Sequence, residues 1–485
     1  MLPISPVIQE LRDQSECYSD RIAFIQGQRV YTYNSLWRSV DRFASRLRSF
    51  GIHKGEVVLF CPYNSTETVL LYLALWQIAA VPCPLMDPES FFRYGITPKA
   101  IVVHDIRLNL IRNLQDWEVH ELEQDSLPRL KIFVNKNDQS IEPDDETFIW
   151  ISSSGTTHSP KVISLSHRGT LFNIQANTKS LELSQEDTTL LILPLAYSYG
   201  LIGQFLSHLY AGAKIVTPVT NGSLRTNFSQ IPLIPSLIEK EKITTLFSVP
   251  VMIRTLNSIF LHLPPITKQF SQLRLLTIGG GMIDSFNLER ILENISKTSI
   301  AVTYGLCEAG PRVSTCFVHE TQPHRQSVGR PIEGVSVNIV DDYGNELPNG
   351  QEGEVVVTSP SVMKGYILNG TNNHCFIPEM KIDTGDLGKL SEEGFLYILG
   401  RKEQALLIDG LRVMPNQIQN ILYRHPDVLH VFVRNGLSLL VIPQPQKSIQ
   451  IEDVFYLLAK EYSSSAKLFT IEVSHQSPAN GFIKS

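Results

Sequence analysis

Three short segments carry side chains that could bind phosphate, a purine and ribose. The first, SSSGTTHSPK at Ser152–Lys161, crowds hydroxyls and backbone N–H groups around Gly155 and ends in a lysine. Such a loop can surround anionic oxygens with hydrogen-bond donors. It lacks the second glycine and the Lys-Ser/Thr ending of a P-loop. Because a loop of this composition alone is more often a solvated turn, it needs support from other segments.

That support comes from two later segments. Tyr304 to Glu308 (YGLCE) follows a predicted strand at Ser299–Thr303, and open α/β sheets bind ligands at the carboxyl ends of their strands. The tyrosine ring could stack on a purine, and the carboxylate could hold magnesium on phosphates. In the third segment, Asp383 to Asp386 (DTGD), a carboxylate beside a turn could accept both hydroxyls of a ribose. A run of charge follows at Gly400 to Glu403.

The elements that must position these segments alternate between short apolar strands and amphipathic helices, which predicts a parallel sheet. Strands are predicted at Thr188–Leu193, Ala213–Val216, Thr244–Val249, Leu273–Ile278 and Ser299–Thr303. Asp284 is the expected N-cap of a helix. Val69–Met86 is interpreted as a buried helix that runs into a buried strand.

The fold class expected is therefore α/β, in two domains. Residues 1–400 form a large N-terminal domain, with doubly wound parallel sheets over about 50–315 and a small β-barrel-like subdomain over about 325–400. Alternation of apolar and polar residues at Val335–Ile339 supports the β-rich part. Residues 401–485 form a small α+β domain, with a helix near Pro415–Arg424.

Composition excludes several other classes of protein. The chain is 43% hydrophobic and 19% charged, and 42 basic against 48 acidic residues give a net charge of −6. Intrinsic disorder is excluded, and nucleic-acid binding is not expected without clustered basic residues. Six scattered cysteines without a C-x-x-C pair favour a reducing, cytoplasmic location. No cleavable signal or membrane span is expected. A serine hydrolase is the poorer alternative, because AYSYG lacks the first glycine of the nucleophile motif.

Taken in order, the segments resemble the adenylate-forming superfamily of acyl- and aryl-CoA synthetases, amino-acid adenylation domains and luciferases. The resemblance covers nearly the whole chain, and its motifs are SSSGTTHSPK, LPLAYSYGL, IGGG, YGLCE, GEVVV, DTGDLG and GRKEQALLIDGLRVMPNQI. It implies an ATP-dependent ligase that converts a carboxylic acid to an acyl-adenylate with release of pyrophosphate. The acyl group then passes to a thiol, either CoA or the phosphopantetheine of an acyl or peptidyl carrier protein.

The resemblance also implies roles for individual residues. The phosphates of ATP would be bound by the loop residues Ser153, Ser154, Gly155, Thr156 and Thr157 with Lys161. Adenine would be flanked by Gly279, Gly280, Gly281, Tyr304 and Gly305, and ribose by Asp386 with Arg401. Mg²⁺ would be held by Thr156 and Glu308. The acid would meet Tyr197 and Gly281. Residues 401–485 would be a mobile domain with Glu403 as its hinge, and Gly410 would face the site during thioester formation.

One departure from the family pattern bears on catalysis. Family members have a lysine one residue after a glycine near the C-terminus, and it reaches the carboxylate and α-phosphate during adenylation. Here Gly481 is followed by Phe482, which supplies no positive charge, and Lys484 lies two residues on. Three alternatives follow: a working ligase that uses Lys484, an enzyme of the thioester half-reaction only, or a catalytically weak adenylate-binding protein. His158, Val162 and Cys307 are smaller departures.

The substrate is expected to be a small-molecule carboxylic acid. Amino-acid-activating members carry an aspartate beside an aromatic residue in the region of Ala196–Tyr197, and this chain has none there. A plain acyl or aryl acid is therefore favoured over an α-amino acid. Tyr197 and Tyr199 would suit an aromatic ring. The acceptor thiol is left open between CoA and a carrier protein.

Overall fold

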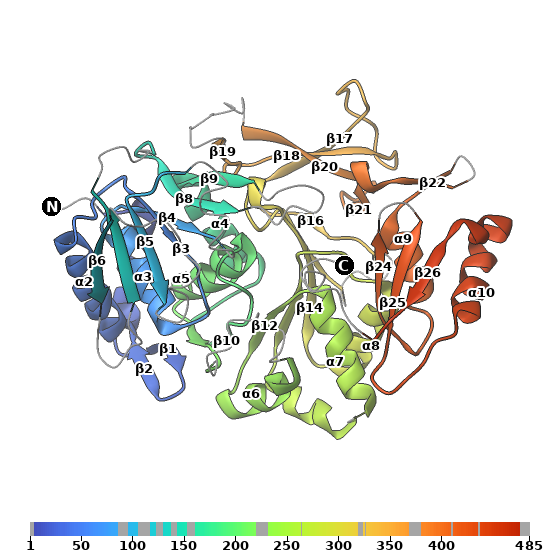
Figure 1. Cartoon of the computed structure of the whole chain (residues 1–485), viewed down its shortest axis with the longest axis horizontal. Coiled ribbons are helices and arrows are strands. Elements are labelled where there is room, and N and C mark those ends of the chain that lie inside the picture. Colours follow the sequence, from blue (N-terminus) through green and yellow to red (C-terminus); the bar gives the residue numbers. More distant parts are fainter. Residues whose placement is uncertain are drawn as a thin grey trace.

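A computed structural model of the chain describes residues 4–85, 96–104, 117–122, 130–136, 143–152, 161–219, 231–262, 264–318, 324, 326–367, 380–408, 411–434 and 437–475. Figure 1 shows a body of α/β layers, a β-rich unit along its upper side and a C-terminal unit at its right. Among the described residues, no helix is long and apolar enough to cross a membrane.

The largest sheet lies at the centre of the body. In hydrogen-bonded order its strands are β16 (Arg330–Pro331), β15 (Ser314–Phe317), β14 (Ser299–Tyr304), β13 (Leu275–Ile278), β12 (Thr245–Ser248), β10 (Thr188–Leu190), β11 (Lys214–Val216), β1 (Ile22–Gln26) and β2 (Arg29–Thr32). The run from β14 to β1 is parallel, and antiparallel strands complete both edges. Burial on both faces explains why these parallel strands read as continuous apolar runs. The strands expected between residues 188 and 303 are confirmed.

A second, mixed sheet packs on the N-terminal side of the body. Its strands are β4 (Val81–Pro84), β3 (Val57–Phe60), β5 (Ala100–His104), β7 (Leu130–Asn135) and β6 (Trp117–Leu122). Helix α3 (Thr66–Gln77) is buried from Thr66 to Trp76 and leads into β4. The interpretation of Val69–Met86 as a buried helix and strand is confirmed for its described part, up to Leu85.

Helices cover both sheets. They are α1 (Pro6–Ser15), α2 (Tyr33–Ser49), α4 (His167–Ser180), α5 (Ser207–Tyr210), α6 (Ile234–Glu241), α7 (Pro250–His262) and α8 (Ser285–Asn294), with the π-helix η4 (Tyr199–Leu206) and the 3-10 turns η1 (Glu16–Tyr18), η6 (Pro264–Phe270) and η7 (Cys307–Ala309). Asp284 caps α8 as expected, because its side chain accepts a hydrogen bond from the N–H of Asn287.

The β-rich unit is an open antiparallel sheet and not the barrel-like form expected from sequence. Its strands are β17 (Ser336–Val340), β18 (Gly353–Thr358), β20 (Lys381–Leu390) and β21 (Leu396–Arg401), in that order. Within the described ranges, β17 and β21 do not pair with each other. Four strands give too small a circumference to enclose side chains, since small barrels use about five to eight.

A separate small sheet joins the β-rich unit to the body. It contains β19 (Gly365–Ile367), β9 (Val162–Ser166) and β8 (Thr147–Ser152). The strand expected before the SSSGTTHSPK loop is β8, but it pairs antiparallel with β9 and takes no part in the parallel sheet. Residues 153–160 of that loop lie outside the described residues.

The C-terminal unit has its own sheet, helices and apolar core. Its elements are η10 (Lys402–Gln404), β22 (Leu406–Ile408), β23 (Leu411–Val413), α9 (Pro415–Leu422), β24 (Val428–Arg434), β25 (Ser438–Pro443), α10 (Ile451–Tyr462), η11 (Ser463–Leu468) and β26 (Thr470–Val473). The core residues of this unit run from Ile408 to Phe469. The expected α+β architecture and the helix near Pro415 are confirmed.

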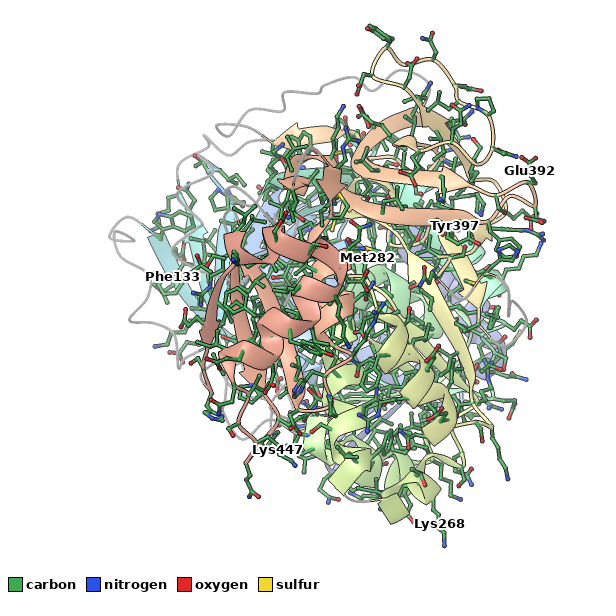
Figure 2. All side chains as sticks on the ribbon, turned by 90° about the vertical axis from the view of Figure 1, so that its right-hand side faces the viewer. Phe133, Lys268, Met282, Glu392, Tyr397 and Lys447 are labelled. Carbon is green, nitrogen blue, oxygen red and sulfur yellow. The ribbon has the colours of Figure 1, made fainter. Side chains whose placement is uncertain are left out.

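This unit packs against helix α7 of the body. The Arg254 guanidinium lies 4.4 Å from the centre of the Tyr423 ring, and the Ser258 hydroxyl donates a 2.6 Å hydrogen bond to the Gln444 side chain. Figure 2 shows the unit from its exposed side, with Lys447 at its lower end. The two parts of the chain therefore meet through specific buried contacts.

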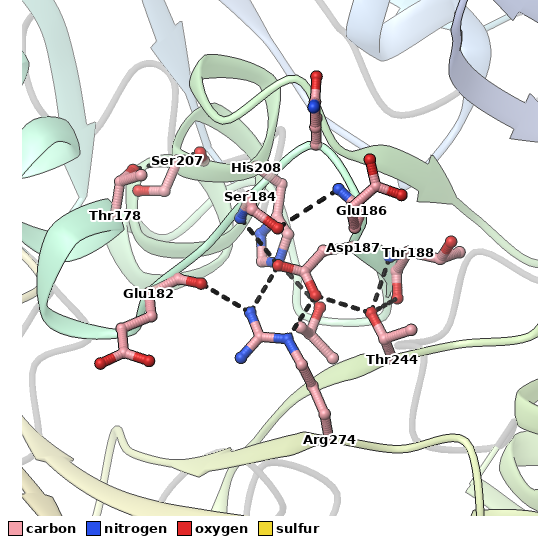
Figure 3. A network of polar contacts seen from close by, with 12 residues as sticks. Thr178, Glu182, Ser184, Glu186, Asp187, Thr188, Ser207, His208, Thr244 and Arg274 are labelled. Carbon is pink, nitrogen blue, oxygen red and sulfur yellow. Dashed lines mark hydrogen bonds and ion pairs between the residues drawn. The ribbon is translucent and has the colours of Figure 1, made fainter.

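A polar network closes the amino ends of the central parallel strands (Figure 3). Asp187, just before β10, accepts two 2.6 Å hydrogen bonds from Arg274, just before β13. It also accepts from the Thr244 hydroxyl and the Ser184 N–H, both at 2.9 Å. Burial alone would raise the pKa of Asp187, but these donors outweigh it and the net pKa is lowered. The network therefore links three strands at the edge opposite the candidate site.

Candidate active site

Three of the predicted residues meet at the carboxyl end of β14. The Tyr304 hydroxyl donates a 2.6 Å hydrogen bond to Asp386 Oδ2, across 82 residues of sequence. Arg401 Nε lies 3.1 Å from Asp386 Oδ1, because β20 and β21 pair these two residues directly. Arg401 also donates to the Thr384 carbonyl at 2.6 Å. The expected adenine-flanking ring and the expected ribose-binding carboxylate thus form one hydrogen-bonded group.

The environment of Tyr304 keeps its hydroxyl protonated. Burial, and then the charge of Asp386, raise the pKa of Tyr304 well above its ordinary value. The hydroxyl therefore stays a donor to the carboxylate at neutral pH. Because that bond fixes one end of the ring, the aromatic face is held in one orientation beside the strand end, as stacking on a planar base requires.

The glycine segment after β13 lies against Tyr199. A Cβ added to Gly279 would lie 2.4 Å from the Thr303 hydroxyl and 3.0 Å from the Tyr199 hydroxyl, so only glycine fits. Gly280 has a φ of +73° and is exposed together with Gly281. The Tyr199 hydroxyl in turn bonds to Thr277 at 2.8 Å. The segment therefore presents exposed backbone at the strand end, with an aromatic wall beside it.

Gly305 has a local structural requirement of its own. A Cβ at this position would lie 2.1 Å from the Pro311 carbonyl oxygen. The chain turns tightly here, since Val313 donates its N–H back to the Tyr304 carbonyl at 2.8 Å. Glycine allows the turn that carries Glu308 back over the strand end.

Glu308 and Lys161 are connected through a residue that sequence reasoning missed. The Tyr366 hydroxyl lies 3.5 Å from Glu308 Oε1, and the Lys161 ammonium lies 4.7 Å from the centre of the Tyr366 ring. Tyr366 is placed there because β19 pairs with β9, directly after Lys161. Its segment, MKGY, carries no motif, and only the strand pairing shows that it separates the two predicted residues.

Tyr197 and its neighbours form the other wall of the site. The Ser198 hydroxyl lies 3.1 Å from the Cys307 sulfur, which joins the LAYSYG segment to the YGLCE turn. Burial, with a smaller effect of Cys307, raises the pKa of Tyr197 to about 12. Tyr197 is therefore a neutral, half-buried phenol between the turn that carries Glu308 and the body.

Of the remaining predicted residues, the structure describes the expected hinge Glu403, and the others lie outside its described ranges. Glu403 is exposed in η10, directly after the last strand of the β-rich unit. Its neighbour Lys402 pairs with Asp342, at 2.8 Å, and with Glu354. The predicted residues outside the described part of the chain are Ser153, Ser154, Gly155, Thr156, Thr157, Gly410, Gly481, Phe482 and Lys484.

A protein-family model and several relatives match this chain over most of its length. The family model for "AMP-binding enzyme" matches residues 11–367. A 2-succinylbenzoate–CoA ligase of Bacillus licheniformis is 26% identical over 448 residues, which cover 87% of this chain and 85% of that protein. The 4-coumarate–CoA ligase CCL1 of Humulus lupulus is 24% identical over 518 residues, covering 96% and 90%.

Solved structures show the same fold at low identity. The anthranilate CoA ligase AuaEII, in complex with anthranoyl-AMP, superposes with a TM-score of 0.80 at 20% identity and covers 98% of this chain and 95% of its own. The o-succinylbenzoate CoA synthetase of Bacillus subtilis, with ATP and magnesium, gives 0.74 at 21% identity, covering 97% and 96%. The likeness therefore extends over the body and the C-terminal unit together.

Proposed function

From the premise that this chain belongs to the AMP-binding enzyme family and is an adenylate-forming enzyme, we propose that it is an ATP-dependent acid–thiol ligase. In the first half-reaction a carboxylate oxygen attacks the α-phosphorus of ATP, and pyrophosphate leaves. In the second, a thiolate attacks the acyl carbon and AMP leaves. The observation that carries the proposal is the group formed by Tyr304, Asp386 and Arg401 at the carboxyl end of β14.

This group is suited to bind the nucleoside. Asp386 would accept the two ribose hydroxyls, with Arg401 Nε holding the carboxylate in place. The Tyr304 ring would lie against one face of adenine. The backbone of Gly279–Gly281, in which Gly280 and Gly281 are exposed, would lie against the other. These contacts would be present before and after chemistry, so they favour binding over rate enhancement.

The phosphates would lie toward Lys161 and Glu308. Glu308 with Thr156 would hold Mg²⁺, which would offset the charge between the acid and the triphosphate. No cluster of three metal-ligating side chains occurs among the described residues. Magnesium is usually held by one or two protein oxygens together with phosphate oxygens. Tyr366, between Lys161 and Glu308, would keep the cation and the carboxylate from pairing with each other.

The C-terminal unit, from residue 401, would act as the mobile domain with Glu403 as its hinge. Lys484 would supply the positive charge that Phe482 cannot. If it does not, the enzyme of the thioester half-reaction or the weak adenylate binder is the better description. The acid would meet Tyr197 and Gly281, and its acceptor would be CoA or a carrier-protein thiol. A cytoplasmic location remains a prediction.

The relatives do not decide the substrate. Their names refer to 2-succinylbenzoate, oxalate, 4-coumarate and indoleacetate, which differ widely in size and polarity. A plain acyl or aryl acid remains our proposal, since LAYSYG carries no aspartate that would pair with an α-ammonium.

ATP–pyrophosphate exchange with a panel of carboxylic acids tests the proposal. We expect exchange with at least one acid, its loss in Lys484→Ala, and a higher rate in Phe482→Lys. Absence of exchange together with CoA transfer from a synthetic acyl-adenylate would indicate the thioester enzyme. If neither ATP nor an acyl-sulfamoyl adenosine binds in calorimetry, the proposed function is wrong.

A further inference from the structure

Arg312 is a fully buried cation next to the proposed acyl pocket, and the proposed nucleotide contacts do not involve it. Its side chain has 0% exposure. Nε donates a 2.7 Å hydrogen bond to the Asn177 side-chain oxygen. Within the described residues, the two terminal nitrogens, Nη1 and Nη2, make no hydrogen bond of 3.5 Å or less. A buried guanidinium normally satisfies all of its donors, so this arrangement is costly for the folded protein.

The charge of Arg312 is also not neutralised. Burial lowers its pKa to about 10, and a polar contact with the Tyr199 hydroxyl acts in the opposite direction, so the guanidinium stays protonated at neutral pH. Arg254, another buried arginine, lies 3.3 Å from the carboxylate of Asp284. No described carboxylate pairs with Arg312 in that way. A buried water could accept its hydrogen bonds but could not balance its charge.

The position of Arg312 points to where a counter-ion could come from. One edge of the Tyr199 ring faces Gly279. The other faces Gly203, where an added Cβ would lie 3.1 Å from the ring and 3.5 Å from Pro311. Arg312 follows Pro311, and its guanidinium carbon lies 5.9 Å from the centre of the Tyr199 ring. Arg312 therefore lies across the Tyr199 ring from the Gly279–Gly281 segment, where the proposed function places the acid.

The segment that carries Tyr199 is irregular beside Arg312. Tyr199 begins the π-helix η4, and wide turns of this kind are frequent at functional sites. Asn177, which accepts the hydrogen bond from Arg312 Nε, also donates to the Gly203 carbonyl of η4 at 2.8 Å. The arginine is therefore held at a fixed place behind the aromatic wall and is not a flexible surface cation.

We propose that the acid activated by this enzyme is a dicarboxylic acid, and that Arg312 determines this specificity. One carboxylate would be adenylated, and the distal carboxylate would accept hydrogen bonds from Nη1 and Nη2. The inference rests on the proposed function and names the substrate class for the same site. A planar guanidinium matches a carboxylate with two parallel bonds, which neither a neutral acid tail nor an ammonium would reproduce.

Binding of acyl-sulfamoyl adenosines tests this without requiring adenylation, so it does not depend on Lys484. Calorimetry would compare succinyl, glutaryl, adipoyl and 3-carboxybenzoyl derivatives with their distal monoamides, which have the same size but no distal charge. For the chain length that fits, we expect the carboxylate to bind about 10- to 100-fold more tightly than the amide. Arg312→Met should remove that ratio while the amide still binds.

Two further variants separate charge from packing. Arg312→Lys keeps the cation but not the planar fork and should retain only part of the ratio. Asn177→Asp would place a carboxylate at the 2.7 Å contact to Nε, neutralise Arg312 internally, and so lower the ratio with the arginine present. A thermal melt of each variant checks that it folds, and Arg254→Lys, a change at the paired buried arginine, is the control that should leave the ratio unchanged.

The outcomes distinguish the two proposals. If no derivative binds, the proposed function fails. If carboxylate and amide derivatives bind equally well at every chain length, or if the ratio survives in Arg312→Met, the enzyme is an adenylate former but Arg312 does not read a second carboxylate, and this inference is overturned.

Discussion

The amino and carboxyl ends of the central parallel strands, called here the amino edge and the carboxyl edge, each have a carboxylate that binds an arginine. The two pairs differ in which elements supply their residues. At the amino edge, Asp187 and Arg274 come from segments just before β10 and β13. The Asp187 side chain is 2% exposed. At the carboxyl edge, Asp386 and Arg401 come from adjacent strands of the β-rich unit, and the sheet contributes only Tyr304. The first pair joins elements within one layer, whereas the second lies where two layers meet.

That difference separates stability from binding. A pair within one layer, with every donor supplied by the fold, holds strands together and leaves no place for a ligand. The pair at the junction between layers contacts Tyr304, at the strand end where we propose that the nucleotide binds. Isosteric changes of the two carboxylates should therefore have different consequences, in nucleotide affinity at one edge and in folding at the other.

The largest expected effect is on the carboxyl edge. Asp386→Asn should raise the KM for ATP about 100-fold in pyrophosphate exchange, because two hydrogen bonds from the ribose to a charged group are weakened at about 1.5 kcal/mol each. Thermal melting should change little, since Arg401 is 35% exposed and can be hydrated. An unchanged KM would mean that the ribose lies elsewhere.

The matched change at the amino edge should affect folding. Asp187→Asn should lower the free energy of unfolding of the body by about 2–3 kcal/mol, because the charged acceptor of Arg274, Thr244 and Ser184 is lost. Urea denaturation measures this, and the KM for ATP should stay within about twofold of wild type. A variant that keeps its urea midpoint but loses nucleotide affinity would reverse the distinction between the edges.

The pH dependence of this second effect has a defined sign. The folded pKa of Asp187 lies below its unfolded value. The ionised carboxylate therefore contributes stability above the unfolded pKa, near 3.9, and loses it as the pH falls through the folded value. The difference between wild type and Asp187→Asn should be constant at neutral pH and disappear in strong acid.

The sequence predicted one edge much better than the other, for a physical reason. Tyr304, Glu308, Asp386 and Arg401 stand in segments with distinctive composition, as expected if, on our proposal, a ligand restricts which residue types can serve at each position. Asp187, Thr244 and Arg274 stand in ordinary strand-flanking segments. Their pairing depends on strand order, in which β10 lies beside both β11 and β12, and no local pattern shows that order.

The same limit explains two residues that were missed at the site and one element that was predicted wrongly. Tyr366 reaches Glu308 only through the pairing of β19 with β9, and Arg312 shows its orphaned donors only once Asn177 and Tyr199 are packed around it. Alternation at Val335–Ile339 predicted a strand correctly but could not show whether its sheet closes. Local periodicity thus predicts elements, while pairing between distant elements decides their partners.

The smallest expected effect concerns His208, a buried histidine at the amino edge. His208 is fully buried beside the Asp187–Arg274 pair, with its ring nitrogens 2.7 Å from the Gln204 carbonyl and 2.9 Å from the Thr245 hydroxyl. Burial lowers its pKa to about 4. Between the unfolded pKa, near 6.5, and about 4, only the unfolded chain binds this proton, so stability should fall by about 1.4 kcal/mol per pH unit.

Urea midpoints between pH 7.5 and pH 5 should drop less steeply in His208→Gln than in wild type. Because His167 and His430 are also buried with lowered pKa values, the slope should decrease without vanishing. Equal slopes in the two proteins would show that His208 titrates alike in both states and that the amino edge does not sense acid through it.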